Sequence, residues 1–401
     1  MSGEEGIQVF VRVRPQNKKE TQLNRSAIEV DPAKSAVIVT NKQGDGKNQQ
    51  FVYDQVGGPE CTQEHVFNKV GQPLCEAVLQ GFNSTIFAYG QTGSGKTHTM
   101  LGGEDSSDVS LAVDSGLIPR VFHYLFSRIE DLKKEGKFDT VVCKASYLEI
   151  YNEVVSDLLS DSASNIVIRD DPRKGVVIEG DSQMAVSSAA DTLQALSLGS
   201  QNRRVAATCM NKESSRSHCC FALHVSTTVK VDGVTTRKYA KFNLIDLAGS
   251  ERQKATNATG DRLKEANNIN RSLSALGNVI MALANSNGHV PYRDSKLTFM
   301  LKDSIGGNSK TCIIANCSPA QECVDETLST LKFVRFAKLV RNMATVNQES
   351  AGGLEALKRE ITRLKAALAE KTAGGEQQGE GQGEGQEGAP AGDGSLAEEG
   401  G

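Results

Sequence analysis

The sequence predicts an α/β fold with a central, mostly parallel, twisted sheet that carries helices on both faces. Over residues 1 to about 341, short apolar runs typical of strands alternate with stretches of helical periodicity, as in doubly wound sheets. The chain has 401 residues, of which 38% are hydrophobic, so it can bury a large core. One apolar run leads directly into a glycine-rich segment, which is typical of a strand that turns into a helix.

That glycine-rich segment predicts a phosphate-binding loop of the P-loop NTPase type. Residues 84–89 are apolar, and residues 90–97 read G-Q-T-G-S-G-K-T. Glycines at three positions let backbone amides turn inward around phosphate oxygens, Lys96 can reach the β and γ phosphates, and the Thr97 hydroxyl can hold Mg2+. The following helix adds its positive N-terminal end. The predicted nucleotide contacts here are Gln91, Thr92, Gly93, Ser94, Gly95, Lys96 and Thr97.

Composition excludes several other classes. No apolar stretch approaches the roughly eighteen residues that span a bilayer, and residues 1–5 are acidic where a secretory signal is basic, so we expect an intracellular, cytoplasmic protein without membrane contact. The nine cysteines form no C-x-x-C pairs and lie mostly in apolar runs, which indicates reduced core thiols. The formal charge is -4, and residues 371–401 account for -6 of it, so the body has no basic excess of the kind that favours nucleic-acid binding.

Composition also divides the chain into zones. Residues 1–341 form the predicted main domain, in which Pro119, Pro172 and Pro291 are expected in connections and residues 102–116 in a long surface loop. Residues 342–353 are a polar linker, and residues 371–401 form a Gly/Glu/Gln-rich tail predicted to be disordered. Between them, residues 354–370 are predicted to form either the opening of a coiled coil, which would make a homodimer, or a lone amphipathic helix. Their apolar residues repeat at steps of three and four: Leu354, Leu357, Ile361, Leu364 and Leu368.

Two further segments supply partners for the phosphate loop. Residues 211–218 read N-K-E-S-S-R-S-H, a set of hydroxyls, an amide and an arginine that suits a γ-phosphate with its Mg2+, although the same residues suit an N-cap or polar turn. Residues 242–251 read F-N-L-I-D-L-A-G-S-E. There an apolar strand ends at Asp246, which can hold Mg2+ through water, and the amide of Gly249 can contact the γ-phosphate.

Together these three segments resemble the nucleotide loop, switch I and switch II of the kinesin motor domain. Within that family the chain is most similar to the kinesin-twelve class of plus-end mitotic motors. Supporting stretches are V-R-V-R-P at 11–15, F-V-Y-D at 51–54, Y-L-E-I-Y-N-E at 147–153, H-V-P-Y-R-D-S-K-L-T at 289–298 and E-T-L-S-T-L-K-F at 326–333.

The resemblance implies a binding site for ATP with Mg2+. Arg12, Arg14 and Pro15 match the family's adenine-side motif, and His98 would lie close to the nucleotide, although His98 also suits an ordinary polar helix position. Independently of the family, the chain lacks the N-K-x-D element that a guanine-specific protein would use.

The resemblance also assigns roles in hydrolysis. Ser215 would join Mg2+ alongside Thr97 and Asp246, and Asn211 would hold the phosphate side. Ser214 with Glu251 would relay the proton of the attacking water, with Gly249 at the γ-phosphate. Arg216 would pair with Glu251 only in the closed state. The alternative is that these two residues form an ordinary surface ion pair without a role in gating.

The implied output is movement along microtubules. The helix expected over residues 262–284 would carry the switch movement, and residues 341–349 resemble the neck linker that docks on the ATP-bound head, with Asn347 as its latch; the alternative is a passive tether. Tubulin is acidic, and the residues expected to face it are Arg252, Lys254, Arg262, Lys264, Tyr292, Arg293, Lys296 and Lys302.

Two other function classes stay open at this point. A nucleotide-gated microtubule cross-linker or depolymerising protein could share the fold without stepping along the filament. A GTPase-type regulatory switch is opposed by the missing guanine element.

Overall fold

The computed structural model describes residues 3–23, 26–40, 48–103, 111–160, 166–210, 214–231, 233–251, 261–286, 288–351, 358–359 and 361–366, without the side chains of residues 23, 207–210, 214 and 261–270. The chain divides into two compact units, Met1–Lys230 with Thr235–Glu349, and Val231–Val234 with Ser350–Gly401. The first unit holds the central sheet and the predicted nucleotide site.

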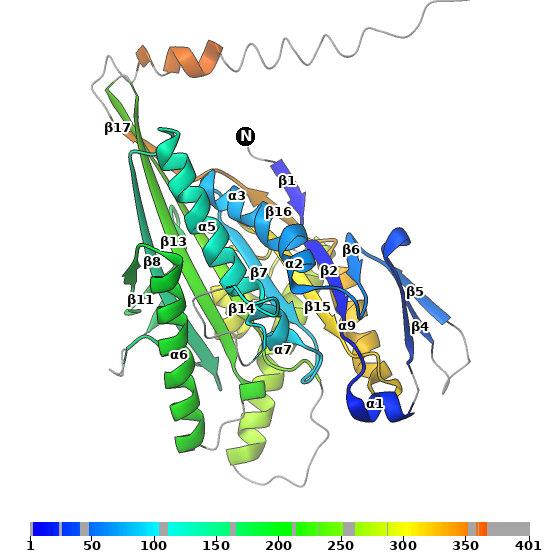
Figure 1. The fold of residues 1–401 in the computed structure, drawn as a ribbon. Helices are drawn as coiled ribbons and strands as arrows, with labels where there is room; N and C mark the ends of the chain where they lie inside the picture. Colours follow the sequence, from blue (N-terminus) through cyan, green and yellow to red (C-terminus); the bar gives the residue numbers. More distant parts are fainter. Residues whose placement is uncertain are drawn as a thin grey trace, which may run out of the picture. The chain divides into compact units, whose positions relative to one another are not determined.

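The central sheet follows the strand order β12-β8-β13-β14-β7-β15-β2-β6 (Figure 1). From β14 to β6 each neighbouring pair runs parallel, whereas β12 and β13 both run antiparallel to β8. The predicted α/β fold is therefore confirmed, with a mixed sheet whose parallel half carries the phosphate loop. The strands are β2 (Gln8–Val13), β6 (Gln55–Gly57), β7 (Ser84–Tyr89), β8 (Thr140–Tyr151), β12 (Met184–Val186), β13 (His218–Val231), β14 (Val234–Asp246) and β15 (Lys310–Cys317), with β9 (Val154–Asp157) beside β8 and β17 (Gln348–Ala351) beside β14.

Both faces of the parallel half are apolar because its strands are buried on both sides. Along β7, Ile86 and Ala88 belong to one core cluster, and Phe87 and Tyr89 belong to the other. A continuous apolar run of this kind is typical of a parallel strand covered by helices on both faces.

Each cluster is completed by its own set of helices. One set comprises α2 (Gln63–Val66), the π-helical segment Phe67–Gly71, α3 (Gln72–Leu79), α4 (Lys96–Met100), α5 (Leu117–Lys134) and α6 (Ala189–Met210). The other comprises α7 (Asp261–Ala284), α8 (Lys296–Met300) and α9 (Val324–Ala337).

Smaller elements surround this body. β3 (Ile28–Asp31), β4 (Ala36–Thr40) and β5 (Asn48–Val52) form a three-stranded sheet, β10 (Val167–Asp171) and β11 (Gly175–Glu179) form a hairpin, and β1 (Gly3–Gly6) pairs with β16 (Arg341–Ala344). The remaining helical turns are α1 (Lys18–Leu23), η1 (Pro32–Lys34), η3 (Ser214–Arg216), η4 (Tyr292–Asp294) and η5 (Gln321–Cys323).

The predicted strands and the predicted helix over 262–284 are confirmed, but one expected connection is wrong. Pro119 lies in the first turn of α5, not in a loop, because a proline there gives up an amide that has no helical partner. Pro172 and Pro291 lie in connections as expected. Of the predicted surface loop, residues 104–110 lie outside the described part, and Gly102 bridges Ser115 across it.

Two compositional expectations can be followed in the structure. Of the eight cysteines whose side chains the structure describes, six are buried and none is in a disulfide, as expected for core thiols. Among the described helices, none is both long and apolar enough to cross a membrane.

Candidate nucleotide-binding site

The candidate site lies where the parallel strands end. The phosphate loop follows β7, and Asp246 ends the neighbouring β14 in register with Ala88 of β7. On the other side, Asn316 near the end of β15 is in register with Arg12 of β2. Because all these strands point the same way, their last side chains converge on one edge, which is the usual place for a ligand in a sheet of this type.

The loop itself depends on glycine at two points. Gly90 has φ 147°, and a Cβ there would overlap the backbone oxygen of Asn316. Gly95 has φ 96° and occupies the N-cap position of α4. Only glycine adopts such conformations without strain, so the predicted cradle of inward amides has a steric basis.

The Lys96 side chain folds against the backbone of the phosphate loop. Its side chain is buried, and its ammonium group donates hydrogen bonds to the backbone oxygens of Gly90, at 2.8 Å, and Gln91, at 2.9 Å. Burial lowers the pKa of Lys96, while Asp246 and Glu251 act in the opposite direction. The ammonium therefore lies within the loop, next to where phosphate oxygens would replace these carbonyl partners.

Thr97 and Asp246 meet at the predicted metal position. The Thr97 hydroxyl donates a 2.7 Å hydrogen bond to Oδ2 of Asp246. Oδ1 of the same carboxylate is buried without a hydrogen-bond partner among the described residues, and burial raises the pKa of Asp246. A hydroxyl and a carboxylate oxygen that lacks a partner form the hard oxygen set that Mg2+ prefers, so the residues present fit that ion.

The two switch-like segments contact each other and the phosphate loop. The Gly249 amide donates to the backbone oxygen of Ser215 at 2.9 Å, and the Ser250 amide donates to the backbone oxygen of Gly90 at 3.1 Å. The Glu251 carboxylate accepts hydrogen bonds from the amide and the hydroxyl of Thr92. Two successive amides, those of Gly249 and Ser250, therefore connect this segment to the backbone of Ser215 and to the backbone of the phosphate loop.

Some predicted catalytic residues remain outside this picture. Asn211 and the side chain of Ser214 lie outside the described residues. Arg216 ends the η3 turn (Ser214–Arg216), and its predicted closed-state pairing with Glu251 stays a prediction.

His218, the last residue of the 211–218 segment, links that segment to the 242–251 segment and to α7, a role that the sequence did not predict. Its Nδ1 accepts a 3.0 Å hydrogen bond from the Ala248 amide, and its Nε2 lies 2.8 Å from the Ser272 hydroxyl on α7. Since Nδ1 accepts, the ring proton must be on Nε2, which donates to Ser272. Burial lowers the pKa of His218 to about 3, so the ring is neutral at physiological pH.

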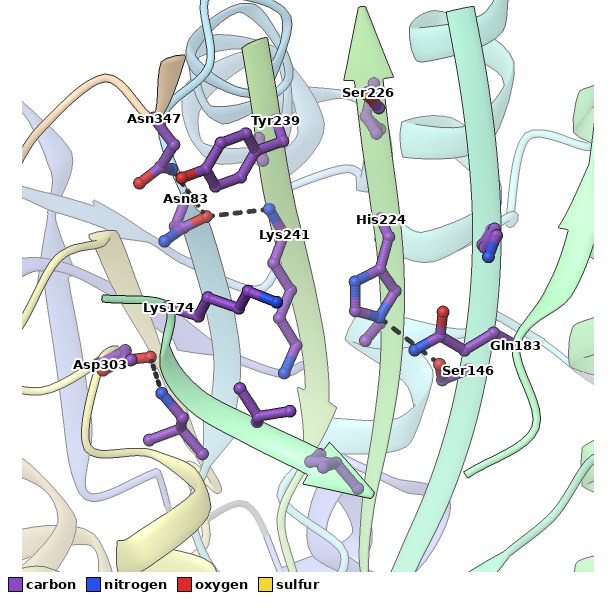
Figure 2. Close-up of a pocket in the computed structure, with 18 of the residues that line it drawn as sticks. Asn83, Ser146, Lys174, Gln183, His224, Ser226, Tyr239, Lys241, Asp303 and Asn347 are labelled. Carbon is purple, nitrogen blue, oxygen red and sulfur yellow. Dashed lines mark hydrogen bonds between the residues drawn. The ribbon is translucent and has the colours of Figure 1, made fainter. Parts of the chain in front are cut away.

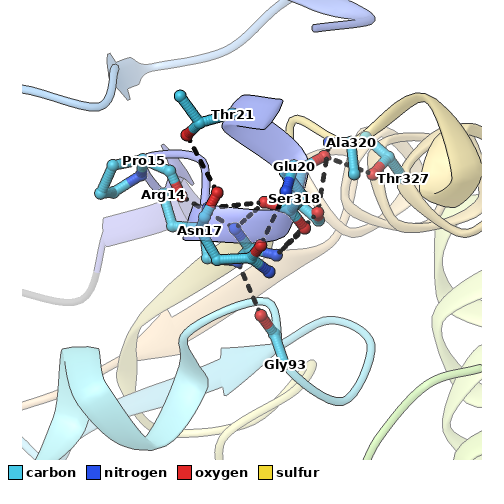
Figure 3. Close-up of polar contacts among 9 residues, drawn as sticks. All are labelled: Arg14, Pro15, Asn17, Glu20, Thr21, Gly93, Ser318, Ala320 and Thr327. Carbon is cyan, nitrogen blue, oxygen red and sulfur yellow. Dashed lines mark hydrogen bonds and ion pairs between the residues drawn. The ribbon is translucent and has the colours of Figure 1, made fainter. Parts of the chain in front are cut away.

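Arg14 braces the phosphate loop from outside (Figure 3). Its Nε donates to the backbone oxygen of Gly93 at 2.7 Å, and its two terminal nitrogens grip the Glu20 carboxylate at 2.7 Å each. The Glu20 hydrogen bond raises the pKa of Arg14, so the guanidinium stays charged. It also bonds the Pro15 backbone oxygen and the Ser318 hydroxyl. Glu20 and Ser318 were not predicted, because nothing in the local sequence marks them.

Arg12 and His98 lie beside the loop, with their polar atoms bonded to protein. Arg12 is buried and donates to the Gln63 side chain at 2.7 Å, the Thr99 hydroxyl at 3.0 Å and the Cys61 backbone oxygen at 3.1 Å. The Gln63 amide nitrogen lies 3.3 Å from Nδ1 of His98. Gln63 therefore links the two residues expected on the adenine side, and their contact with a base stays a prediction.

The predicted linker segment runs over two strands in this structure. β16 pairs antiparallel with β1, from Gly3 opposite Ala344 to Gly6 opposite Arg341. Asn342 on β16 is buried, and its amide group donates to three acceptors in residues 304–311 and accepts from the Gly306 amide at 2.7 Å. The N-terminal strand and this anchor hold the segment along the edge of the main unit.

Asn347 closes the end of that segment. Its side-chain nitrogen donates to the Gly81 backbone oxygen at 3.0 Å and to Oδ1 of Asn83 at 3.2 Å, and its oxygen accepts from Asn308 at 2.9 Å. Its backbone adds two bonds, to Gly81 at 2.9 Å and from the Tyr239 amide at 3.0 Å. One side chain thus connects the segment to two separate loops, residues 81–83 and the loop that holds Asn308.

The residues expected to face tubulin are described only in part. Arg252 and Lys254, and the side chains of Arg262 and Lys264, lie outside the described residues. Arg293 and Lys296 are exposed around η4 and α8. Lys302 is half-buried and pairs with Asp170 of the β10–β11 hairpin.

Comparison with known proteins agrees with this architecture. A family profile described as the kinesin motor domain matches residues 12–340. The kinesin-like protein KIN-12E of Arabidopsis thaliana is 48% identical over 375 residues, which cover 90% of this chain and 29% of that protein. The kinesin-like protein KIF15 of Mus musculus is 46% identical over 376 residues, 92% of this chain and 27% of that protein. The chain therefore spans between a quarter and a third of the length of these relatives.

A solved structure shows the same fold. It is described as the structure of a fast kinesin, with implications for ATPase mechanism and interactions with microtubules. It superposes with a TM-score of 0.77 and 37% identity, and the match covers 86% of this chain and 94% of that one.

Proposed function

Because the chain belongs to the kinesin motor domain family and is most similar to its kinesin-twelve class, we propose that it is a microtubule-stimulated ATPase that moves along microtubules. One observation carries this proposal: the Gly249 amide donates to the backbone oxygen of Ser215, and the next amide, that of Ser250, donates to Gly90 in the phosphate loop. A phosphoryl group that competes for the Gly249 amide would change the contacts of both switch segments at once. The protein would accordingly act on the microtubule cytoskeleton.

The proposed substrate is ATP with Mg2+. Lys96 and the loop amides would neutralise the phosphates, and Thr97, Asp246 and Ser215 would hold Mg2+, which supplies charge stabilisation for the γ-phosphoryl group when bound. Little covalent chemistry is needed in such a transfer, so correct positioning of the attacking water is the main task of the protein.

Proton handling belongs to the residues around Glu251. Ser214 and Glu251 would relay the proton of the attacking water after Arg216 joins Glu251. In the arrangement described here the Glu251 carboxylate is held by Thr92, so closure would exchange the Thr92 partner for Arg216. This exchange is the step that we assign to the arrival of ATP.

The output would be docking of residues 341–349. Pairing of β16 with β1 and the bonds of Asn347 support a docked arrangement in this structure. His218 connects the start of switch II to Ser272 on α7, the helix expected to meet tubulin. We assign plus-end direction to the motor because its head precedes its linker.

The nucleotide preference is tested by comparing steady-state turnover of ATP and GTP, each with and without polymerised tubulin. The proposal predicts turnover of ATP that rises with microtubules and little turnover of GTP. Equal turnover of both nucleotides, without stimulation, would reject the motor in favour of a general NTPase.

Movement is tested separately by microtubule gliding over surface-bound protein. The proposal predicts that filaments glide with their minus ends leading. Filaments that bind in an ATP-dependent way without gliding would instead support the nucleotide-gated cross-linker.

A further inference from the structure

A cavity of about 840 Å³ lies on the antiparallel half of the sheet, away from the proposed nucleotide site; at one margin it reaches the linker residue Asn347. Its back wall is one face of three neighbouring strands, β8, β13 and β14, and residues 172–178 of the β10–β11 hairpin line another side (Figure 2). None of the phosphate-loop residues lines it. The volume is that of a site for a small organic molecule.

Side chains of a strand point alternately to the two faces of the sheet, and those on one face line the cavity. Lys144, Ser146 and Leu148 on β8 point to the same side, and His224 and Cys220 on β13 stand in register with Lys144 and Leu148. Leu148 and Cys220 are buried, so the cavity has an apolar end and a polar end. Such a division suits a ligand with an apolar body and one polar head.

The polar end is rich in cations. The lining holds five basic residues, Lys144, Arg173, Lys174, Arg237 and Lys241, against three acidic ones, Asp181, Asp303 and Glu349. The half-buried Asp303 already accepts a 2.7 Å hydrogen bond from the Val176 amide. Within the described part of the chain, the ammonium groups of Lys144, Lys174 and Lys241 make no hydrogen bond or ion pair, although the charge of Lys241 acts on the nearby Asp303 carboxylate. Their charge is therefore not balanced by direct contacts.

Lys241 is the most enclosed of these three cations. It is half-buried, whereas Lys144 and Lys174 are exposed, and in Figure 2 the Lys174 side chain is directed toward the side chain of Lys241. Burial lowers the pKa of the neighbouring His224 to about 3, with Lys241 and Lys144 adding to the effect, so His224 is neutral at pH 7. The positive charge in the cavity then comes from the lysines and arginines.

We infer that this cavity binds a small organic anion, whose carboxylate is held by Lys241 with Lys174 and whose apolar body packs on the Leu148 and Cys220 end. A half-buried lysine whose ammonium group makes no hydrogen bond or ion pair contacts a carboxylate more strongly than an exposed lysine does, because less water competes for it.

The test uses 2-naphthoate, a carboxylate on a flat apolar body, and protein saturated with MgADP to occupy the nucleotide site. Isothermal titration is expected to show binding to the wild-type chain that falls by about tenfold or more in Lys241→Met, the loss typical of one charge-assisted hydrogen bond. Lys241→Arg retains a cation and is expected to retain most of the affinity. Lys133→Met, on the exposed end of α5, is the matched control and is expected to leave it unchanged.

Neutral 2-naphthamide separates the charge from the apolar body and is expected to bind at least about tenfold more weakly than 2-naphthoate. Thermal unfolding of each variant checks that it is folded. The inference is overturned if 2-naphthoate does not bind, if the amide binds equally well, or if Lys241→Met binds like the wild type.

Discussion

The contacts of Asn347 make a quantitative prediction about the linker. In Asn347→Ala, three side-chain hydrogen bonds to residues 81, 83 and 308 are lost, and all of them are partly exposed. At about 0.7 kcal/mol for each bond, within the net range of such hydrogen bonds, their loss reduces the stability of the docked segment by roughly 2 kcal/mol. The docked arrangement then opens about thirtyfold more often.

Native-state hydrogen exchange measures this opening without any label. The reporters are the Tyr239 amide, which donates to the backbone oxygen of residue 347, and the Met343 amide, which donates to Gly307. With Mg2+ and a non-hydrolysable ATP analogue, both are expected to lose about thirtyfold of their protection in Asn347→Ala. The Ile314 amide in the central sheet is expected to keep its protection, because the core is not opened.

Gln348→Ala is the matched control, since this neighbouring side chain is exposed. It is expected to leave both reporters as in the wild type. Unchanged protection of Tyr239 and Met343 in Asn347→Ala would contradict this role of Asn347, as would an equal loss of protection at Ile314, which would indicate general destabilisation.

Three further predictions concern the nucleotide site and its surroundings. Glu251→Ala or Arg216→Ala is expected to abolish microtubule-stimulated ATP turnover and to leave ATP binding largely intact; near-normal stimulated turnover in both would defeat their assignment. Asp246→Asn is expected to raise the Mg2+ concentration needed for half-maximal turnover by about tenfold, measured by Mg2+ titration, and an unchanged requirement would remove Asp246 from the metal site. The pKa of His218 is lowered to about 3, so below about pH 6.5 the unfolded chain binds a proton at this residue that the folded chain does not bind. The free energy of unfolding therefore decreases as the pH falls below about 6.5, and His218 contributes up to about 1.4 kcal/mol per pH unit to that decrease. His218→Asn is expected to flatten the decline of the thermal midpoint between about pH 6.5 and pH 5, with His224 keeping its own share, and a decline as steep as in the wild type would contradict the assignment.

Local pattern was enough to predict the parts of the site that lie next to each other in the chain. The run from Ser84 to Thr97 contains a strand, a glycine turn and a helix start, and each depends on short-range sterics. The ends of strands could be predicted in the same way, because an apolar run that stops at Asp246 places the Asp246 carboxylate at the edge of the sheet.

What could not be predicted depends on contacts between distant residues. Pairing of Gly3–Gly6 with Arg341–Ala344 joins the two ends of the main domain, and nothing in either segment specifies the other. Gln63 and Glu20 hold the two arginines of the adenine-side motif, yet both are ordinary polar residues in sequence. His218 belongs to a segment that the sequence singled out, but its hydrogen bond to Ser272 forms only when α7 packs against β13, which the local sequence does not specify.

In the proposed function, one pocket senses the terminal phosphoryl group and communicates with a surface that meets tubulin. The most direct measurement is steady-state phosphate release from ATP as polymerised tubulin is titrated into the purified protein. We expect a rate that rises with the tubulin concentration and reaches a plateau. A rate that stays the same from zero to saturating tubulin would contradict it.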